Sequence, residues 1–251
     1  MTKFATLLAA AASLAAISGG TAAVAAPVRN VVLVHGAFAD GSGWKPVADI
    51  LRKDGYHVSI VQEPLTSVED DAAATKRVLD QQDGPAVLVG HSYGGAVITA
   101  AGDHPNVSAL VYVAAFAPDQ GETLGGLVQG TPPASNSIRP TKDGFLFINQ
   151  ADFDADFAGD LPKAEADFMA ISQMPIAGKT FGEPFAAPAW KAKPSYGIVA
   201  TGDRMINPQL ERTMYARAHA RITEVKGSHV IFISQPRAVA TVIETAAHEA
   251  R

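Results

Sequence analysis

Short apolar runs recur along this chain and alternate with longer helical patterns. Because these runs are apolar at almost every position, they predict strands covered on both faces, as in a mostly parallel sheet. Alternation of strand and helix is typical of a doubly wound α/β fold. We expect about six strands, over 31–34, 58–61, 86–89, 110–113, 198–200 and 222–225, and helices over 44–53, 68–82, 96–104, 208–218 and 236–247.

Residues 118–190 interrupt this alternation. The stretch is rich in Pro, Gly, Phe and Asp, with one helical pattern over 163–173 and no convincing strand. An insert of this length without structure is uncommon in a compact domain, so we expect a small cap folded over the functional site. A disordered loop is the alternative.

The beginning of the chain has the three regions of a secretory signal peptide: Lys3, an apolar run over 4–17, and Ala23-Val24-Ala25. We expect cleavage after residue 25, which leaves a single domain over 26–251. A membrane anchor is the alternative, but the apolar run is shorter than the roughly 18 residues that a spanning helix needs. The sequence therefore predicts a secreted or periplasmic protein without stable membrane insertion.

Charge and cysteine content narrow the chemistry. The formal net charge is −5 and no basic cluster is present, so nucleic acid is not an expected partner. The chain has no Cys, which excludes disulfides, thiolate metal sites and a cysteine nucleophile.

The strongest motif is Gly90-His91-Ser92-Tyr93-Gly94, a G-x-S-x-G between an expected strand and an expected helix. In that context the serine lies on a strained turn, and the flanking glycines remove side chains that would clash there. The dipole of the following helix places positive charge near a developing oxyanion. Ser92 is therefore the candidate nucleophile.

A serine hydroxyl needs a base, and in this arrangement the base follows the acid near the end of the chain. His229 lies between the last expected strand and the last helix, whereas the other late histidine, His248, belongs to a polar chain end. For the acid, Asp203 follows the strand at 198–200. Asp119 is its competitor because it follows the strand at 110–113, although it also marks the entry to the expected cap.

Acyl transfer also needs hydrogen-bond donors for an oxyanion. These are usually the backbone N–H after the nucleophile and one from the loop after an early strand. The corresponding residues are Tyr93 and Ala37, and Gly36 permits the tight turn that directs the amide of Ala37 inward.

These segments together resemble the α/β-hydrolase superfamily over nearly the whole of residues 26–251. Within it, they are similar to a branch that includes plant methyl-ester esterases and hydroxynitrile lyases, with bacterial esterase-like relatives. The resemblance rests on Val34-His35-Gly36-Ala37 with Gly43-Trp44, on Gly90 to Gly95, on Ile198 to Arg204, and on Gly227-Ser228-His229.

The resemblance implies a triad of Ser92, Asp203 and His229, oxyanion donors at Ala37 and Tyr93, and an apolar pocket under a small cap. Lyases of the branch that use a lysine carry it directly after the catalytic His and have a Thr near the oxyanion loop. Here those positions are Val230 and Gly36, which favours ester hydrolysis. Only a few residues separate the expected cleavage site from Val31, so we expect the early strands of the larger fold to be absent and the core to have about six strands.

Several apolar residues are candidates for a substrate pocket, although packing of the core is the commoner fate of such side chains. No residue cluster suggests a cofactor or metal. The sequence predicts a serine hydrolase acting on small, largely apolar carboxylic esters, and leaves open a cofactor-free lyase or a ligand-binding protein on the same fold. The candidate pocket residues are Phe38, Trp44, Phe116, Phe168 and Met169.

Overall fold

The computed structural model describes residues 1–2 and 28–250, and the expected strands form one six-stranded parallel sheet. The predicted signal peptide lies, apart from residues 1–2, outside the described residues. The doubly wound α/β fold predicted from the sequence is confirmed. In spatial order β2-β1-β3-β4-β8-β9, the strands are β2 (His57–Val61), β1 (Asn30–Val34), β3 (Ala86–His91), β4 (Val107–Val113), β8 (Ser195–Ala200) and β9 (Arg221–Val225).

Burial along the strands accounts for the different sequence patterns of central and edge strands. Every residue of β1, β3 and β8 is buried, whereas the edge strands β2 and β9 are partly exposed. Only a strand that is covered on both faces needs an unbroken apolar run. The weaker pattern of residues 222–225 therefore reflects the position of β9 at an edge.

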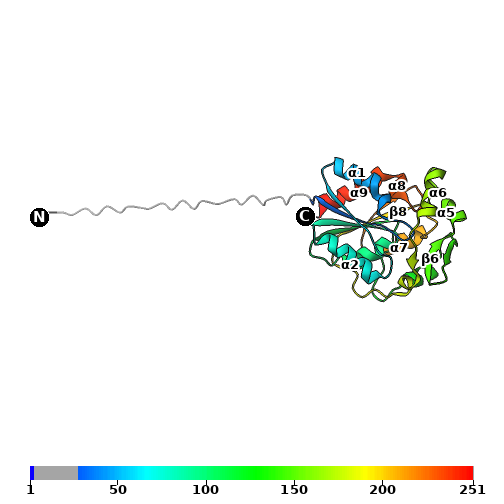
Figure 1. Ribbon diagram of the computed structural model, residues 1–251. Coiled ribbons are helices and arrows are strands. Elements are labelled where there is room, and N and C mark those ends of the chain that lie inside the picture. Colours follow the sequence, from blue (N-terminus) through cyan, green and yellow to red (C-terminus); the bar gives the residue numbers. More distant parts are fainter. Residues whose placement is uncertain (3–27, 251) are drawn as a thin grey trace.

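Helices cover both faces of the sheet (Figure 1). On one face α1 (Lys45–Lys53) packs against α9 (Pro236–Glu249), and on the other α2 (Val68–Leu79) packs against α3 (Tyr93–Ala101). The helix α7 (Pro208–Arg217) connects β8 to β9. None of the helices in the described part of the chain is long and apolar enough to cross a membrane.

The insertion, residues 118–190, lies between β4 and β8 and has its own secondary structure. The expectation that it lacks strands is wrong, because β5, β6 and β7 form a small antiparallel sheet. These strands are only 3, 4 and 2 residues long, too short to produce a readable periodicity. The elements are α4 (Leu124–Gly130), β5 (Ile138–Pro140), β6 (Phe145–Ile148), α5 (Gln150–Phe157), α6 (Lys163–Ser172), β7 (Ile176–Ala177) and the 3-10 helices Gly178–Gly182 and Ala189–Lys191.

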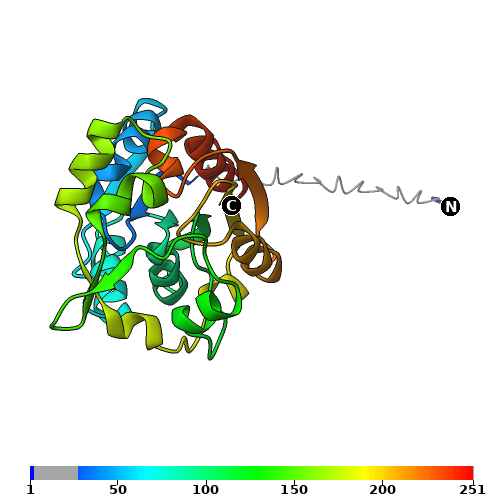
Figure 2. The ribbon, with the colours of Figure 1, turned by 90° about the vertical axis from the view of Figure 1, so that its right-hand side faces the viewer.

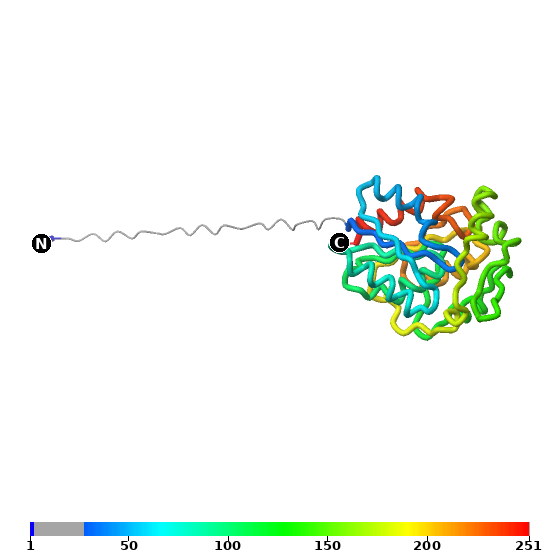
Figure 3. The backbone as a smooth tube through the Cα atoms, in the orientation of Figure 1, coloured from blue at the N-terminus to red at the C-terminus, as the bar shows by residue number. Residues whose placement is uncertain are grey.

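The insertion occupies one end of the molecule, beyond the carboxyl ends of the parallel strands (Figures 2 and 3). The last turn of α9 lies at the opposite end (Figure 3). In open α/β sheets, functional residues gather outside the carboxyl ends of the strands. The insertion therefore lies beside the loops that carry the candidate site residues.

Candidate active site

Ser92 lies at the sharp turn where β3 ends and α3 begins. Its backbone angles are φ 53° and ψ −120°, a region that residues other than glycine rarely adopt and that costs about 1–3 kcal/mol. A Cβ on Gly94 would lie 2.3 Å from the carbonyl oxygen of His35, so only glycine lets the helix begin this close to β1. As a result α3 begins at Tyr93 rather than at residue 96, and its N-terminus adjoins Ser92.

His229 lies between Ser92 and Asp203. Its Nε2 is 2.9 Å from Ser92 Oγ, and its Nδ1 is 2.6 Å from Asp203 Oδ2. Because a carboxylate can only accept a hydrogen bond, Nδ1 of the neutral ring carries the hydrogen and donates a hydrogen bond to Asp203. Nε2 is then free to accept a hydrogen bond from the hydroxyl group of Ser92. The exposed fractions are 7% for Ser92, 4% for Asp203 and 1% for His229. The structure thus brings the three candidates together in one buried hydrogen-bonded chain.

The loop after β8 fixes the carboxyl group of Asp203. Its Oδ1 accepts hydrogen bonds from the backbone N–H groups of Met205, at 2.7 Å, and Ile206, at 3.0 Å. The competing candidate, Asp119, instead forms an ion pair with Lys191 at 2.6 Å. The Lys191 ammonium lowers the pKa of Asp119. His248, the competing histidine, lies in the last turn of α9.

Two backbone N–H groups next to Ser92, those of Ala37 and Tyr93, have no backbone acceptor within residues 28–250. They are the two amides that the sequence analysis singled out as oxyanion donors. A Cβ on Gly36 would lie 2.7 Å from Ser92 Cβ, so the loop that carries Ala37 reaches the serine only because residue 36 has no side chain. The side chain of Tyr93 is engaged elsewhere, since its hydroxyl donates to Asp71 Oδ2 at 2.7 Å.

His91, the first of the two variable residues of the G-x-S-x-G motif, contacts both the backbone and the ring of His229. Its Nε2–H donates to the backbone carbonyl of His229 at 2.9 Å, and the centroids of the two rings are 4.7 Å apart. Complete burial lowers the pKa of His91 well below its ordinary value, so the ring stays neutral and places no second charge next to His229. The G-x-S-x-G pattern alone assigns no role to this histidine.

The insertion contacts the loop that carries His229, and the sequence did not predict this contact. The carboxylate of Asp160 accepts hydrogen bonds from the backbone N–H of Ser228, at 2.8 Å, from the Ser228 hydroxyl, and from Ser234 Oγ at 2.8 Å. The ring of Phe157 meets His229 edge-on, with 5.0 Å between the centroids. These contacts shield the imidazole and hold its loop against the insertion.

The insertion also contacts the other two loops of the site. Arg204, next to Asp203, donates from Nε to Asp156 Oδ1 at 2.9 Å. On the oxyanion loop, the N–H of Phe38 donates to the carbonyl of Met174 at 3.1 Å. The insertion therefore touches each of the loops that carry Asp203, His229 and Ala37.

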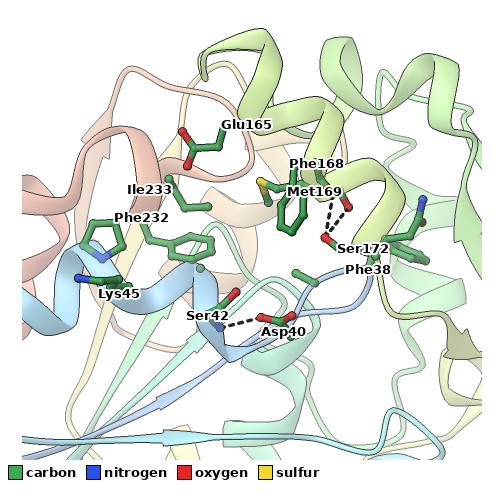
Figure 4. Close-up of a pocket in the computed structure, with 14 residues that line it drawn as sticks. Phe38, Asp40, Ser42, Lys45, Glu165, Phe168, Met169, Ser172, Phe232 and Ile233 are labelled. Carbon is green, nitrogen blue, oxygen red and sulfur yellow. Dashed lines mark hydrogen bonds between the residues drawn. The ribbon is translucent and has the colours of Figure 1, made fainter.

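A cavity of about 240 Å³ lies beside the oxyanion loop, between α6, the 3-10 helix Gly41–Trp44 and the chain after His229 (Figure 4). Three of the candidate pocket residues, Phe38, Phe168 and Met169, line it together with Phe232 and Ile233. Ser92 and His229 are not among its lining residues. The cavity is therefore a neighbour of the hydrogen-bonded chain and does not contain it.

The other two candidate pocket residues have different surroundings. Trp44 is fully buried and packs against Phe232, with the rings tilted by 40° and 4.4 Å between their centroids. Phe116 is 4% exposed, and its N–H donates to the carbonyl of Ser92 at 3.1 Å. Neither residue lines the cavity. Among the described residues no group of three or more His, Cys, Asp or Glu side chains could hold a metal ion.

A family model described as the alpha/beta hydrolase family matches residues 31–242. Among curated proteins, the chain is 37% identical to the carbendazim hydrolyzing esterase of a Nocardioides species over 121 residues, which is 42% of this chain and 50% of that enzyme. It is 29% identical to the pyrethroid hydrolase of Sphingobium wenxiniae over 251 aligned residues, 86% of each chain.

Two solved structures are also similar to this chain. A pyrethroid hydrolase from Sphingobium faniae superposes with a TM-score of 0.75 at 25% identity, covering 88% of this chain and 97% of that one. The crystal structure of polyneuridine aldehyde esterase superposes with a TM-score of 0.75 at 16% identity, covering 86% and 98%. The second likeness concerns the fold alone.

Proposed function

The chain belongs to the alpha/beta hydrolase family, and on that premise we propose that it is a carboxylic ester hydrolase that works through Ser92, His229 and Asp203. The observation that carries the proposal is the unbroken path from Ser92 Oγ to His229 Nε2, at 2.9 Å, and from His229 Nδ1 to Asp203 Oδ2, at 2.6 Å. Both curated relatives described above are named as hydrolytic enzymes, which supports the same reaction class.

In the proposed reaction, Ser92 Oγ attacks the ester carbonyl while its proton passes to His229 Nε2. The imidazolium then protonates the leaving alcohol, and an acyl group remains on the serine. A water molecule, deprotonated by His229, attacks the acyl carbonyl and releases the acid. Asp203 keeps the imidazole in the required tautomer and stabilises the imidazolium.

The oxyanion formed at each step is assigned to the N–H groups of Ala37 and Tyr93, because both lie beside Ser92 without a backbone acceptor in the described chain. The N-terminus of α3 adds the positive end of a helix dipole. Neither contribution needs a metal or a cofactor, so the proposal assigns none.

Two positions favour ester hydrolysis over cyanohydrin cleavage. Val230, directly after His229, is fully buried and carries no charge. Residue 36 has no room for a side chain, because a Cβ there would lie 2.7 Å from Ser92 Cβ. The cavity beside Phe38 suits a small ester, since its apolar wall of Phe38, Phe168 and Phe232 faces polar lining residues such as Ser42 and Gln173.

Pre-steady-state hydrolysis of p-nitrophenyl acetate and butyrate tests this proposal. We expect a burst of p-nitrophenol equal to the concentration of active sites, followed by slower turnover, because an activated ester acylates the serine faster than water hydrolyses the acyl-enzyme. Ligand binding by a folded protein without any turnover would favour a receptor on the same fold, and release of an aldehyde from a cyanohydrin would favour a lyase.

We also propose that the chain is exported and then released from its leader. Lys3, the apolar run over 4–17 and Ala23-Val24-Ala25 support this. The mature protein should therefore begin at Ala26 when it is recovered outside the cytoplasm, which N-terminal sequencing would reveal. Recovery of the intact chain from the cytoplasm alone would contradict export.

A further inference from the structure

Glu211, on α7, is a fully buried acidic residue that the proposed reaction does not use. Its Oε2 accepts the backbone N–H of Ala200, at the end of β8, at 3.2 Å. Its Oε1 is buried and receives no hydrogen bond from any N–H or O–H group of the described chain. An ionised carboxylate in that state is costly, because a buried charge needs hydrogen bonds or a counter-charge.

Within the described chain, the one cation that acts on Glu211 is Arg212, and its charge opposes the rise in the pKa of Glu211 less strongly than burial and Asp203 promote it. Arg212, its neighbour on α7, binds Glu224 with two hydrogen bonds of 2.9 Å at the surface. The hydroxyl of Tyr215 is occupied by the backbone of Ala115, with distances of 2.8 and 2.9 Å. What remains is another carboxyl residue, Asp203. Its backbone N–H donates to the carbonyl of Ala200 at 3.1 Å, and Ala200 in turn donates its own N–H to Glu211 at 3.2 Å, so both acidic residues lie at the end of β8.

Burial, together with the adjacent Asp203 carboxylate, raises the pKa of Glu211 well above its ordinary value. Two neighbouring buried carboxyl groups share a proton readily, since both cannot be ionised without strong repulsion. The proton belongs on Glu211, because Asp203 accepts hydrogen bonds from Met205, Ile206 and His229, whereas Glu211 accepts only one. Hydrogen bonds to a carboxylate favour its charged form.

We propose that Glu211 is a positioning residue, which stays protonated at neutral pH and donates a hydrogen bond from its carboxyl group to Asp203. This role rests on the proposed function, since Asp203 is the residue that orients His229. This hydrogen bond would give the buried Oε1 of Glu211 a partner. It would also hold the Asp203 carboxylate from α7, in addition to the two backbone amides of the loop that carries Asp203.

The variant Glu211→Gln tests the proposal in the activity assay. It keeps a neutral donor of similar shape, so we expect kcat within about threefold of wild type and no movement of the acidic limb of the kcat/KM pH profile. If Glu211 were ionised, this variant would remove a negative charge near His229 and move that limb about one pH unit lower. Such a movement would overturn the proposal.

The variant Glu211→Leu tests the hydrogen bond itself. It removes the donor while it fills the space, and we expect kcat about tenfold lower, with the acidic limb moved to higher pH because the Asp203 carboxylate gains charge density. Wild-type kcat and an unmoved limb in a folded Glu211→Leu protein would show that Glu211 does not position Asp203. Thermal unfolding followed by circular dichroism establishes that each variant is folded.

Infrared spectroscopy detects the carboxyl proton of Glu211 without an activity assay. At pH 8, wild type should show a carbonyl band of a protonated carboxyl group that Glu211→Gln lacks. Glu63→Gln is the matched control, because Glu63 is a second buried carboxyl whose pKa is raised by burial but which follows β2, at the opposite edge of the sheet from β9. It should remove a different band and leave the acidic limb in place.

The infrared result separates this inference from the proposed function. A protein that hydrolyses no ester would contradict the proposed function, while the band would still decide whether Glu211 holds a proton. Active wild type without a band that Glu211→Gln removes would overturn the inference and leave the ester hydrolase proposal intact.

Discussion

Ser92→Ala should lower kcat/KM for p-nitrophenyl butyrate by about 10⁵- to 10⁶-fold, the scale seen when a nucleophilic serine is removed from a triad. The hydroxyl of Ser92 is the group that His229 Nε2 meets at 2.9 Å, and alanine leaves nothing to form the acyl-enzyme. Initial rates at high enzyme concentration measure the loss. Because alanine only removes an oxygen atom, the variant should unfold at nearly the wild-type temperature.

Ser108→Ala is the matched control for this loss. Ser108 lies near the beginning of β4, whereas the candidate site adjoins the carboxyl ends of the strands. The control should keep wild-type kcat/KM. Retention of more than about 1% of wild-type activity by purified Ser92→Ala would show that another residue acts as the nucleophile, since a lost triad serine costs far more.

Asp203→Asn should lower kcat by about 10⁴-fold while the protein remains folded. The amide nitrogen of asparagine can donate a hydrogen bond to His229 Nδ1, and the neutral imidazole would then carry its proton on Nε2. In that tautomer Nε2 cannot accept the proton of Ser92. Single-turnover measurements of acylation would place the loss at the first chemical step. Substrate binding should change little, because Asp203 is 4% exposed and lies behind the imidazole.

Asp119→Asn is the control that distinguishes the two candidate acids. Asp119 pairs with Lys191 on the partly exposed side of the insertion, and such pairs contribute about 1 kcal/mol or less to stability. The variant should therefore keep kcat within about threefold of wild type. A large loss in Asp119→Asn combined with an active Asp203→Asn would exchange the two roles and refute the assignment.

The sheet could be predicted from sequence because its central strands are buried on both faces. β1 and β3 are apolar almost throughout, and short unbroken apolar runs between helical patterns are typical of strands in a covered parallel sheet. Ser92 could be predicted for a similar reason, because the glycines around it and the strand before it are local features. His229 and Asp203 followed from their order after Ser92, each on a loop after a strand.

The support of the site could not be predicted in the same way. Glu211, His91 and Asp160 each reach residues that are distant in sequence or act through backbone groups. No local pattern marks such contacts, because they depend on the packing of the finished fold. An aspartate in a turn between two helices, such as Asp160, otherwise reads as an ordinary capping or turn residue.

The residues that line the cavity could likewise be predicted only in part. Phe38 and Trp44 are both large aromatic residues in the same stretch of chain, yet Phe38 lines the cavity and Trp44 packs on Phe232. Their roles differ through side-chain direction, which the sequence does not encode locally. The insertion is another example, since its strands are stabilised by pairing with each other rather than by a periodic apolar face.

Covalent labelling with a fluorophosphonate probe, followed by mass mapping of the modified peptide, tests the central claim most directly. We predict one adduct per chain, on Ser92, which is absent from Ser92→Ala and forms much more slowly in His229→Ala. A folded wild-type protein that takes up no probe, or takes it up on a different residue, would contradict the assignment of Ser92 as the nucleophile.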